Sequence, residues 1–160
     1  QAILANDEFQ SRINNSIPAS QIKAEDYQGV FYPGGFGLLS DLANNQQVAA
    51  ISASIYDTGA TIGAVCHGPA GLLPIKLANG NSILEGNIVT AFTREEEVDY
   101  GTISKIPFLL EESLTRAAGG FNKIAPWGEH VIEQPQLITG QNPASAGAVG
   151  RAMAKRLNAG

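Results

Sequence analysis

The chain has 160 residues, 44% of them hydrophobic and 16% charged, which is the balance of one globular domain with a buried core. Its net charge of -5 argues against nucleic acids and anionic membranes as partners, and no apolar run reaches the length of a membrane span. The single cysteine excludes an internal disulfide and predicts a reducing, cytoplasmic setting. We therefore treat residues 1–160 as a single domain.

Helical and strand-like segments alternate along the chain. The first 20 residues are polar, with apolar side chains at roughly helical spacing, and predict one or two helices and a loop. In chain order, the later segments predict a strand at 30–32, helices at 38–43 and 46–57, a strand at 62–65, a helix at 69–77, a strand at 88–92, a helix at 107–118, a hairpin from 131–132 and 137–139, and a helix at 145–157. This alternation indicates an α/β domain with a mainly parallel sheet.

Cys66 lies at the predicted junction between a buried strand and a helix opened by Pro69. Gly63 and Gly68 flank it and permit a sharp turn, as in a nucleophile elbow with cysteine in place of serine. A helix N-terminus behind the sulfur is expected to lower the thiol pKa and make the cysteine easy to oxidise. The alternative is a buried structural cysteine without chemistry.

Three predicted strands end in residues that could form one reactive centre. These ends are the glycine-rich segment 33–37, the pair Cys66-His67, and the acidic segment 92–97. Ligands of open α/β sheets bind at the carboxyl ends of the strands, so the three ends would supply oxyanion donors, a nucleophile with a base, and an orienting carboxylate. The backbone N–H of His67 is a further candidate oxyanion donor.

Other readings of these segments have less support. The glutamates at 95–97 can simply complement a helix dipole in solvent, and at most one of them needs to be catalytic. The sequence contains neither glycine-rich nucleotide-binding motif, so no nucleotide cofactor is expected. We expect no metal site, because two histidines and one cysteine show no ligand spacing, and we read His130 as an ordinary loop residue.

The chain resembles the ThiJ/PfpI superfamily, whose relatives include the class I glutamine amidotransferases. Two further segments, 107–111 and 137–145, resemble its glyoxalase III branch, which also includes holding chaperones. The superfamily likeness rests on the segments Tyr-x-x-Val-Phe-Tyr-Pro-Gly-Gly-Phe-Gly-x-x-x-Asp-Leu at 27–42, Ala-Val-Cys-His-Gly-Pro-Ala at 64–70, and Thr-Ala-Phe-Thr with the glutamates that follow at 90–97. The resemblance implies a flavodoxin-like three-layer sandwich and a cofactor-free catalytic site.

Residue by residue, the resemblance implies a Cys-His-acid site. Cys66 matches the family nucleophile, His67 the histidine after it, and Glu97 the acid of the triad. We expect His67 to pair with Glu97, since neighbouring residues in a first helical turn point in different directions and only one of the three glutamates can aim at the imidazole.

The glycine-rich segment is expected to bind the substrate and its oxyanion. The resemblance assigns oxyanion donors to Gly35 and the His67 backbone, and places Gly34 and Phe36 beside them. The branch usually has histidine where this chain has Phe36, so the pocket is expected to be more apolar here.

The resemblance implies a lyase-type (hydro-lyase) conversion of methylglyoxal, a small α-oxoaldehyde, to lactate without a cofactor, repair of early glycation adducts, or chaperoning. A holdase-type stress chaperone with Cys66 as a redox-sensitive thiol is therefore one alternative. A cysteine amidase or peptidase is another, because a Cys-His-acid triad also permits it.

The chain also departs from the family pattern at its beginning. Family members start with a strand, a loop and a second strand that have no counterpart before residue 27. The apolar strand at 30–32 would then form an open sheet edge, which proteins avoid. We therefore expect a companion N-terminal fragment or a homodimer to cover it.

Overall fold

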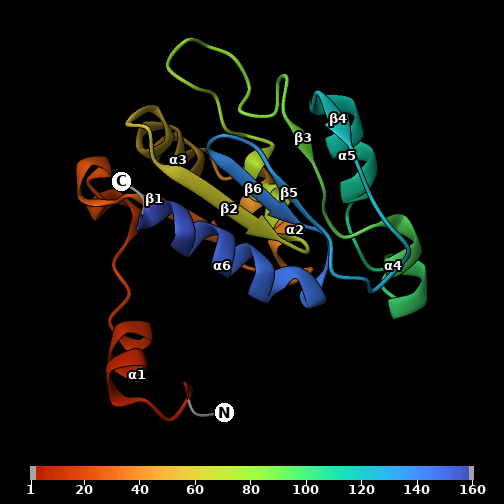
Figure 1. Cartoon of the computed structure of the whole chain (residues 1–160), viewed down its shortest axis with the longest axis horizontal. Helices are drawn as coiled ribbons and strands as arrows, with labels where there is room; N and C mark the ends of the chain where they lie inside the picture. Colours follow the sequence, from red (N-terminus) through yellow and green to blue (C-terminus); the bar gives the residue numbers. More distant parts are fainter. Residues whose placement is uncertain (1–2, 159–160) are drawn as a thin grey trace.

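The computed structural model describes residues 3–158, which form a mixed, mostly parallel sheet between layers of helices (Figure 1). The main sheet has the strand order β1-β2-β6-β5, in which β1, β2 and β6 are parallel and β5 is antiparallel to β6. Its strands are β1 (Gly29–Tyr32), β2 (Thr61–Val65), β5 (Val131–Glu133) and β6 (Leu137–Gly140). Two short parallel strands, β3 (Ile88–Val89) and β4 (Gly120–Phe121), form a second sheet.

Within residues 3–158, six α-helices and several short 3-10 turns flank or connect the strands. The helices are α1 (Asp7–Asn14), α2 (Leu38–Asp41), α3 (Gln46–Asp57), α4 (Arg94–Tyr100), α5 (Leu110–Ala117) and α6 (Ala146–Leu157). The 3-10 turns are η1 (Ala19–Gln21), η2 (Ala24–Asp26), η3 (Leu42–Asn44), η4 (Gly68–Leu72) and η5 (Pro143–Ser145). Among residues 3–158, no helix combines the length and hydrophobicity needed to span a bilayer.

The alternation of side chains along β2 builds two cores, one on each face of the sheet. Ile62 and Ala64 are fully buried in the core that also holds residues of α3. Val65 belongs to the other core, with Val149 and Met153 of α6. Because successive strand residues face opposite sides, helices cover both faces. The domain is therefore the predicted flavodoxin-like three-layer sandwich.

The outer edge of β1 has no strand partner among the described residues. β1 pairs in parallel with β2, and Tyr32 is buried while the side chain of Phe31 is 44% exposed. Helix α1 lies apart from the sheet in Figure 1 and contributes no buried residue. The expectation that a further polypeptide segment covers this edge stays a prediction.

Several expected elements are shorter than the sequence predicted, including the helix expected at 107–118, which is α5 over Leu110–Ala117. The helix expected at 69–77 is the 3-10 turn η4, which ends at Leu72. Pro74 accounts for this, because proline has no N–H to donate and its ring clashes with the carbonyl four residues earlier in an α-helix. The strand expected at 88–92 is regular over Ile88–Val89, and Phe92 instead donates its N–H to the carbonyl of Cys66.

Candidate active site

Cys66 forms the elbow at the end of β2. Its φ of +62° lies in the left-handed region, which side chains other than glycine rarely adopt and which active sites commonly retain. The backbone is fixed on both sides, because Cys66 N–H donates to the carbonyl of Gly140 and Phe92 N–H donates to the carbonyl of Cys66, each at 2.9 Å. The thiol therefore stands at the carboxyl end of the parallel strands.

The structure brings the three predicted catalytic residues together in a line. His67 Nδ1 lies 3.3 Å from Cys66 Sγ, and His67 Nε2 lies 2.7 Å from Glu97 Oε1. Glu97 is a carboxylate acceptor, so Nε2 carries the proton and Nδ1 faces the sulfur as an acceptor. His67 and Glu97 are almost completely buried, which shields their contact from water.

Thr102 fixes the other side of the Glu97 carboxylate, a role that no local sequence pattern predicts. Its hydroxyl donates to Glu97 Oε2, while Nε2–H of His67 occupies Oε1. Gly101, with φ of +71°, ends α4 and turns the chain so that Thr102 N–H reaches the carbonyl of Glu97. A glycine after a helix is the signal that could have predicted this return of the chain.

The glycine-rich segment approaches Cys66 closely. A Cβ on Gly34 would lie 2.9 Å from the Cβ of Cys66 and 3.3 Å from its Sγ, so a larger residue would displace the thiol. Gly35 has φ of +129°, which favours glycine, and its backbone N–H and that of His67 favour the thiolate form of Cys66. Two backbone donors therefore lie beside the Cys66 sulfur.

The expectation of an acidic thiol is wrong for this structure. Burial raises the pKa of Cys66 to about 11, against the lowering effect of the backbone N–H groups of His67 and Gly35. The carboxylates of Glu96 and Glu97 raise it further. The helix dipole expected behind the sulfur is weak, because η4 is a five-residue 3-10 turn rather than an α-helix. The prediction that Cys66 oxidises readily depended on a lowered thiol pKa, which Cys66 does not have in this structure.

Glu96 is buried, so the alternative in which the glutamates simply complement the helix dipole in solvent is wrong for this residue. Its Oε2 accepts from the N–H and hydroxyl of Thr93, and its Oε1 accepts from the N–H of Trp127 and the side-chain amides of Gln141 and Asn142. Burial alone would raise its pKa, but these hydrogen bonds outweigh burial and lower it. Thr93 and Glu96 form a capping box, a spacing that is visible in the sequence.

Glu95 points to the surface, as expected for a glutamate in a first helical turn. Its carboxylate pairs with Lys123 at 2.8 Å. His130 bonds Asn122 through Nε2 at 2.9 Å and lies away from the Cys66 site. In the described part of the chain, no three His, Cys, Asp or Glu side chains converge as metal ligands.

A cavity of about 190 Å³ opens onto the Cys66 sulfur. Its walls are mostly aromatic, and the lining residues are Gly35, Phe36, Cys66, His67, Phe92, Tyr100, Trp127 and Pro143. The Phe92 ring packs against the imidazole of His67, with ring centroids 4.5 Å apart, and against the indole of Trp127 at 5.6 Å. All three elements predicted to form the site thus reach this cavity.

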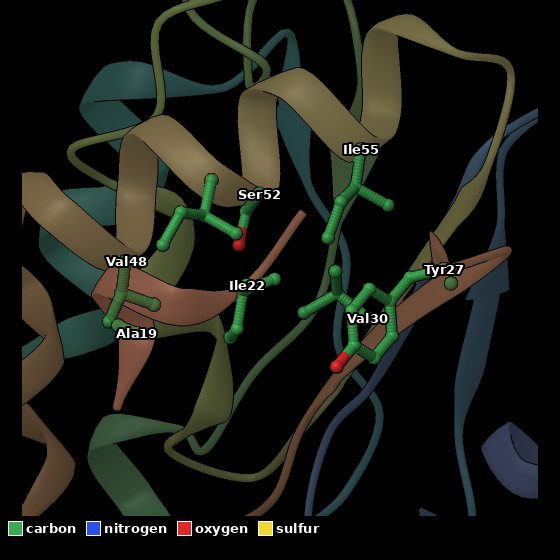
Figure 2. A pocket seen from close by; sticks show the side chains of 9 residues that line it. Ala19, Ile22, Tyr27, Val30, Val48, Ser52 and Ile55 are labelled. Carbon is green, nitrogen blue, oxygen red and sulfur yellow. The ribbon is translucent and has the colours of Figure 1, made fainter. Parts of the chain in front are cut away.

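A second cavity, of about 220 Å³, lies between α3, β1 and the N-terminal segment (Figure 2). Its walls are apolar side chains such as Ile22, Val30 and Ile55. Ser52 is its one hydroxyl neighbour from α3, and that hydroxyl is already bonded to Tyr32 at 2.6 Å. The cavity beside Cys66 is therefore the candidate active site.

Comparison with known proteins agrees with this geometry. Residues 5–156 match the DJ-1/PfpI family. The chain belongs to the DJ-1/PfpI family. The probable glutathione-independent glyoxalase hsp3104 of Schizosaccharomyces pombe is 36% identical over 158 residues, covering 96% of this chain and 71% of that protein.

Two further DJ-1/PfpI relatives are glyoxalases. The glutathione-independent glyoxalase HSP31 of Saccharomyces cerevisiae is 31% identical over 88% of this chain, which spans 62% of HSP31. The crystal structure of glyoxalase III from Candida albicans superposes with a TM-score of 0.88 at 26% identity, covering 96% of this chain and 68% of that one. The chain thus resembles the glyoxalase members of the DJ-1/PfpI family, and spans less than two thirds of HSP31.

Proposed function

We propose that this chain is the catalytic part of a glutathione-independent glyoxalase that converts methylglyoxal to lactate without a cofactor. The observation that supports this most directly is the line Cys66 Sγ, His67 Nδ1, His67 Nε2 and Glu97 Oε1, with contacts of 3.3 and 2.7 Å, beside a small cavity. The named glyoxalase relatives favour this function over a holdase or an amidase. A cytoplasmic location fits the unpaired Cys66 thiol.

The first step forms a hemithioacetal. The Cys66 sulfur attacks the aldehyde carbon, its proton passes to Nδ1 of His67, and the carbonyl electron pair moves onto oxygen. Because the thiol pKa is about 11, the cysteine is protonated at neutral pH, so His67 must take the proton as the carbon–sulfur bond forms. The N–H groups of Gly35 and His67 lie at the sulfur, where they can stabilise the oxyanion before the imidazolium protonates it.

The second step moves hydrogen between the two substrate carbons. His67 takes a proton from the former aldehyde carbon and returns it to the neighbouring ketone carbon, which leaves a 2-hydroxy thioester on Cys66. Water then hydrolyses the thioester, releases lactate and restores the thiol. One carbon is oxidised and its neighbour reduced, so no external electron carrier is needed. In reverse, lactate loses water to give methylglyoxal, which places the reaction with the hydro-lyases.

Lactate production from methylglyoxal, measured without glutathione, tests this function. We expect the wild-type chain to form lactate, and Cys66→Ala to lose about 10³-fold or more of kcat, as nucleophile removal does in comparable enzymes. The proposal fails if Cys66→Ala forms lactate at the wild-type rate, or if a folded wild-type chain forms none.

A further inference from the structure

Outside Cys66 and His67, the wall of the active-site cavity is mostly aromatic and carries no charged side chain. Beyond Cys66 and His67, the wall is formed by Phe36, Phe92, Tyr100 and Trp127 together with Pro143. The groups that can bind a polar atom, His67 and the N–H groups of Gly35 and His67, gather at the sulfur. The cavity therefore has a polar reactive end and an apolar end.

Three of these aromatic rings are exposed although they are large and apolar. Phe36 is 49% exposed, Tyr100 64% and Trp127 41%. Large apolar rings at the mouth of a cavity indicate a ligand-binding surface rather than a folding core, because they leave apolar area in contact with water. Trp127 and Tyr100 also contact each other, with centroids 6.2 Å apart.

The backbone of Trp127 is strained in this position, and hydrogen bonds hold the residue there. Its φ is +66°, which is unfavourable for a bulky side chain. Glu96 accepts its backbone N–H at 2.9 Å, and Asp99 accepts the indole N–H at 3.0 Å. The indole is therefore a fixed wall of the cavity rather than a surface ring free to turn away.

The cavity has room for more than a methyl group but not for a large molecule. Its volume of about 190 Å³ is below the range of about 300–1,000 Å³ that is typical of sites for drug-sized ligands. A methyl substituent would leave most of the aromatic wall without a contact. A flat aromatic ring would fill it and stack on the rings.

We propose that this site prefers α-oxoaldehydes with an aromatic or bulky apolar substituent over methylglyoxal, and that the exposed ring of Phe36 contributes to this preference. The inference rests on the proposed glyoxalase function. The chemistry is unchanged: an aryl oxoaldehyde such as phenylglyoxal plus water gives the aryl hydroxy acid mandelate, with hydrogen moved from the aldehyde carbon to the ketone carbon.

The first test compares kcat/KM for phenylglyoxal and methylglyoxal by chromatography of mandelate and lactate. We expect the wild-type chain to favour phenylglyoxal about tenfold, and Phe36→Ala and Phe36→His to lower that ratio about tenfold, since apolar pockets discriminate by such factors. The control is Phe31→Ala, a similarly exposed phenylalanine on β1 outside the cavity, which should leave the ratio unchanged. A wild-type ratio of one or less, or a ratio insensitive to Phe36, overturns the inference.

A binding test separates this inference from the proposed function. Trp127 is the chain's single tryptophan and lines the cavity, so its fluorescence reports binding there. In Cys66→Ala, which cannot form the covalent intermediate, mandelate should change the fluorescence with a Kd about tenfold lower than that of lactate. If no oxoaldehyde is turned over but mandelate binds more tightly, the glyoxalase function fails and the aromatic preference stands. Equal binding of the two acids overturns the preference.

Discussion

Glu96 Oε1 accepts a hydrogen bond at 2.9 Å from the backbone N–H of Trp127, 31 residues further along the chain. The same oxygen also binds the side-chain amides of Gln141 and Asn142 from the end of β6. One buried carboxylate thus fixes the start of α4, the loop that carries the indole, and the segment before α6. It positions the walls of the cavity without touching the reacting sulfur.

Replacing this carboxylate should destabilise the fold. Glu96→Gln turns one acceptor oxygen into an NH₂ group that faces hydrogen-bond donors, so we expect the free energy of unfolding at pH 7 to fall by about 2–3 kcal/mol. The measurement is urea denaturation followed by circular dichroism. Glu112→Gln, a half-exposed glutamate on α5, is the control and should change stability little. Equal stability of Glu96→Gln and wild type would contradict this role.

The same substitution should change how stability depends on pH. The pKa of Glu96 is lowered in the folded state, so its stabilisation is fully present above the unfolded value of about 4.3 and is lost as the pH falls through the folded value. The difference in unfolding free energy between wild type and Glu96→Gln should therefore shrink as the pH is lowered from 6 toward acid. A difference that stays constant over that range would show that the pKa of Glu96 is the same in the folded and the unfolded chain.

Gly35 should tolerate no side chain. With φ of +129°, an alanine there costs about 1–3 kcal/mol of backbone strain and turns its N–H away from the sulfur. Loss of one oxyanion donor lowers kcat by about 10²–10³-fold. Gly37 offers the control, since its φ is -57° and a Cβ there would meet no atom within 4 Å. Lactate assays of Gly35→Ala and Gly37→Ala should therefore differ, and similar activities would remove Gly35 from the oxyanion site.

The thiol of Cys66 should react slowly at neutral pH. Its pKa of about 11 leaves little thiolate, so alkylation by iodoacetamide should accelerate up to about pH 11 in the folded chain. The urea-unfolded chain should instead level off above the free-cysteine value of about 8.5. Mass spectrometry of the alkylated chain gives both profiles. A plateau below pH 8 in the folded chain would mean that a thiolate is already formed at rest.

Glu95 and Glu97 lie two residues apart, but replacing each of them should affect turnover very differently. Glu97→Gln removes the negative charge beside His67 Nε2 that stabilises the imidazolium formed when His67 takes the thiol proton, and we expect kcat to fall by about 10²–10⁴-fold, the usual value of acid–base catalysis. Glu95→Gln removes an exposed ion pair with Lys123 and should leave kcat unchanged. If Glu95→Gln impairs turnover and Glu97→Gln does not, the pairing of His67 with Glu97 has no catalytic role.

Local patterns were sufficient to predict most elements of the fold. Helix α3 begins at Gln46 and ends at Asp57, as its spacing and the following Gly59 predicted. The strand β2 and the turn at Cys66 were likewise visible, because a short apolar run flanked by glycines has few alternatives. The helix after the elbow is shorter than its apolar spacing predicted, because Pro74 prevents the turn from continuing as an α-helix.

The remaining features of the site depend on contacts that no local pattern contains. The burial of Glu96 is decided by Gln141 and Asn142, about 45 residues away in the sequence. The thiol pKa of Cys66 is decided first by burial, which requires the packed structure. The hydroxyl of Thr102 reaches Glu97 because Gly101 reverses the chain. Each of these three features depends on the folded structure and not on a local sequence pattern.

The central claim, covalent catalysis by Cys66 with His67 as its base, is tested most directly by trapping the intermediate. The purified chain is mixed with methylglyoxal, quenched in acid within one turnover, digested, and analysed by mass spectrometry. The account predicts that the Cys66 peptide carries the mass of one methylglyoxal, that hydroxylamine removes this mass as expected for a thioester, and that His67→Asn forms much less of the adduct. Lactate production with an unmodified Cys66 peptide at every time point would contradict it.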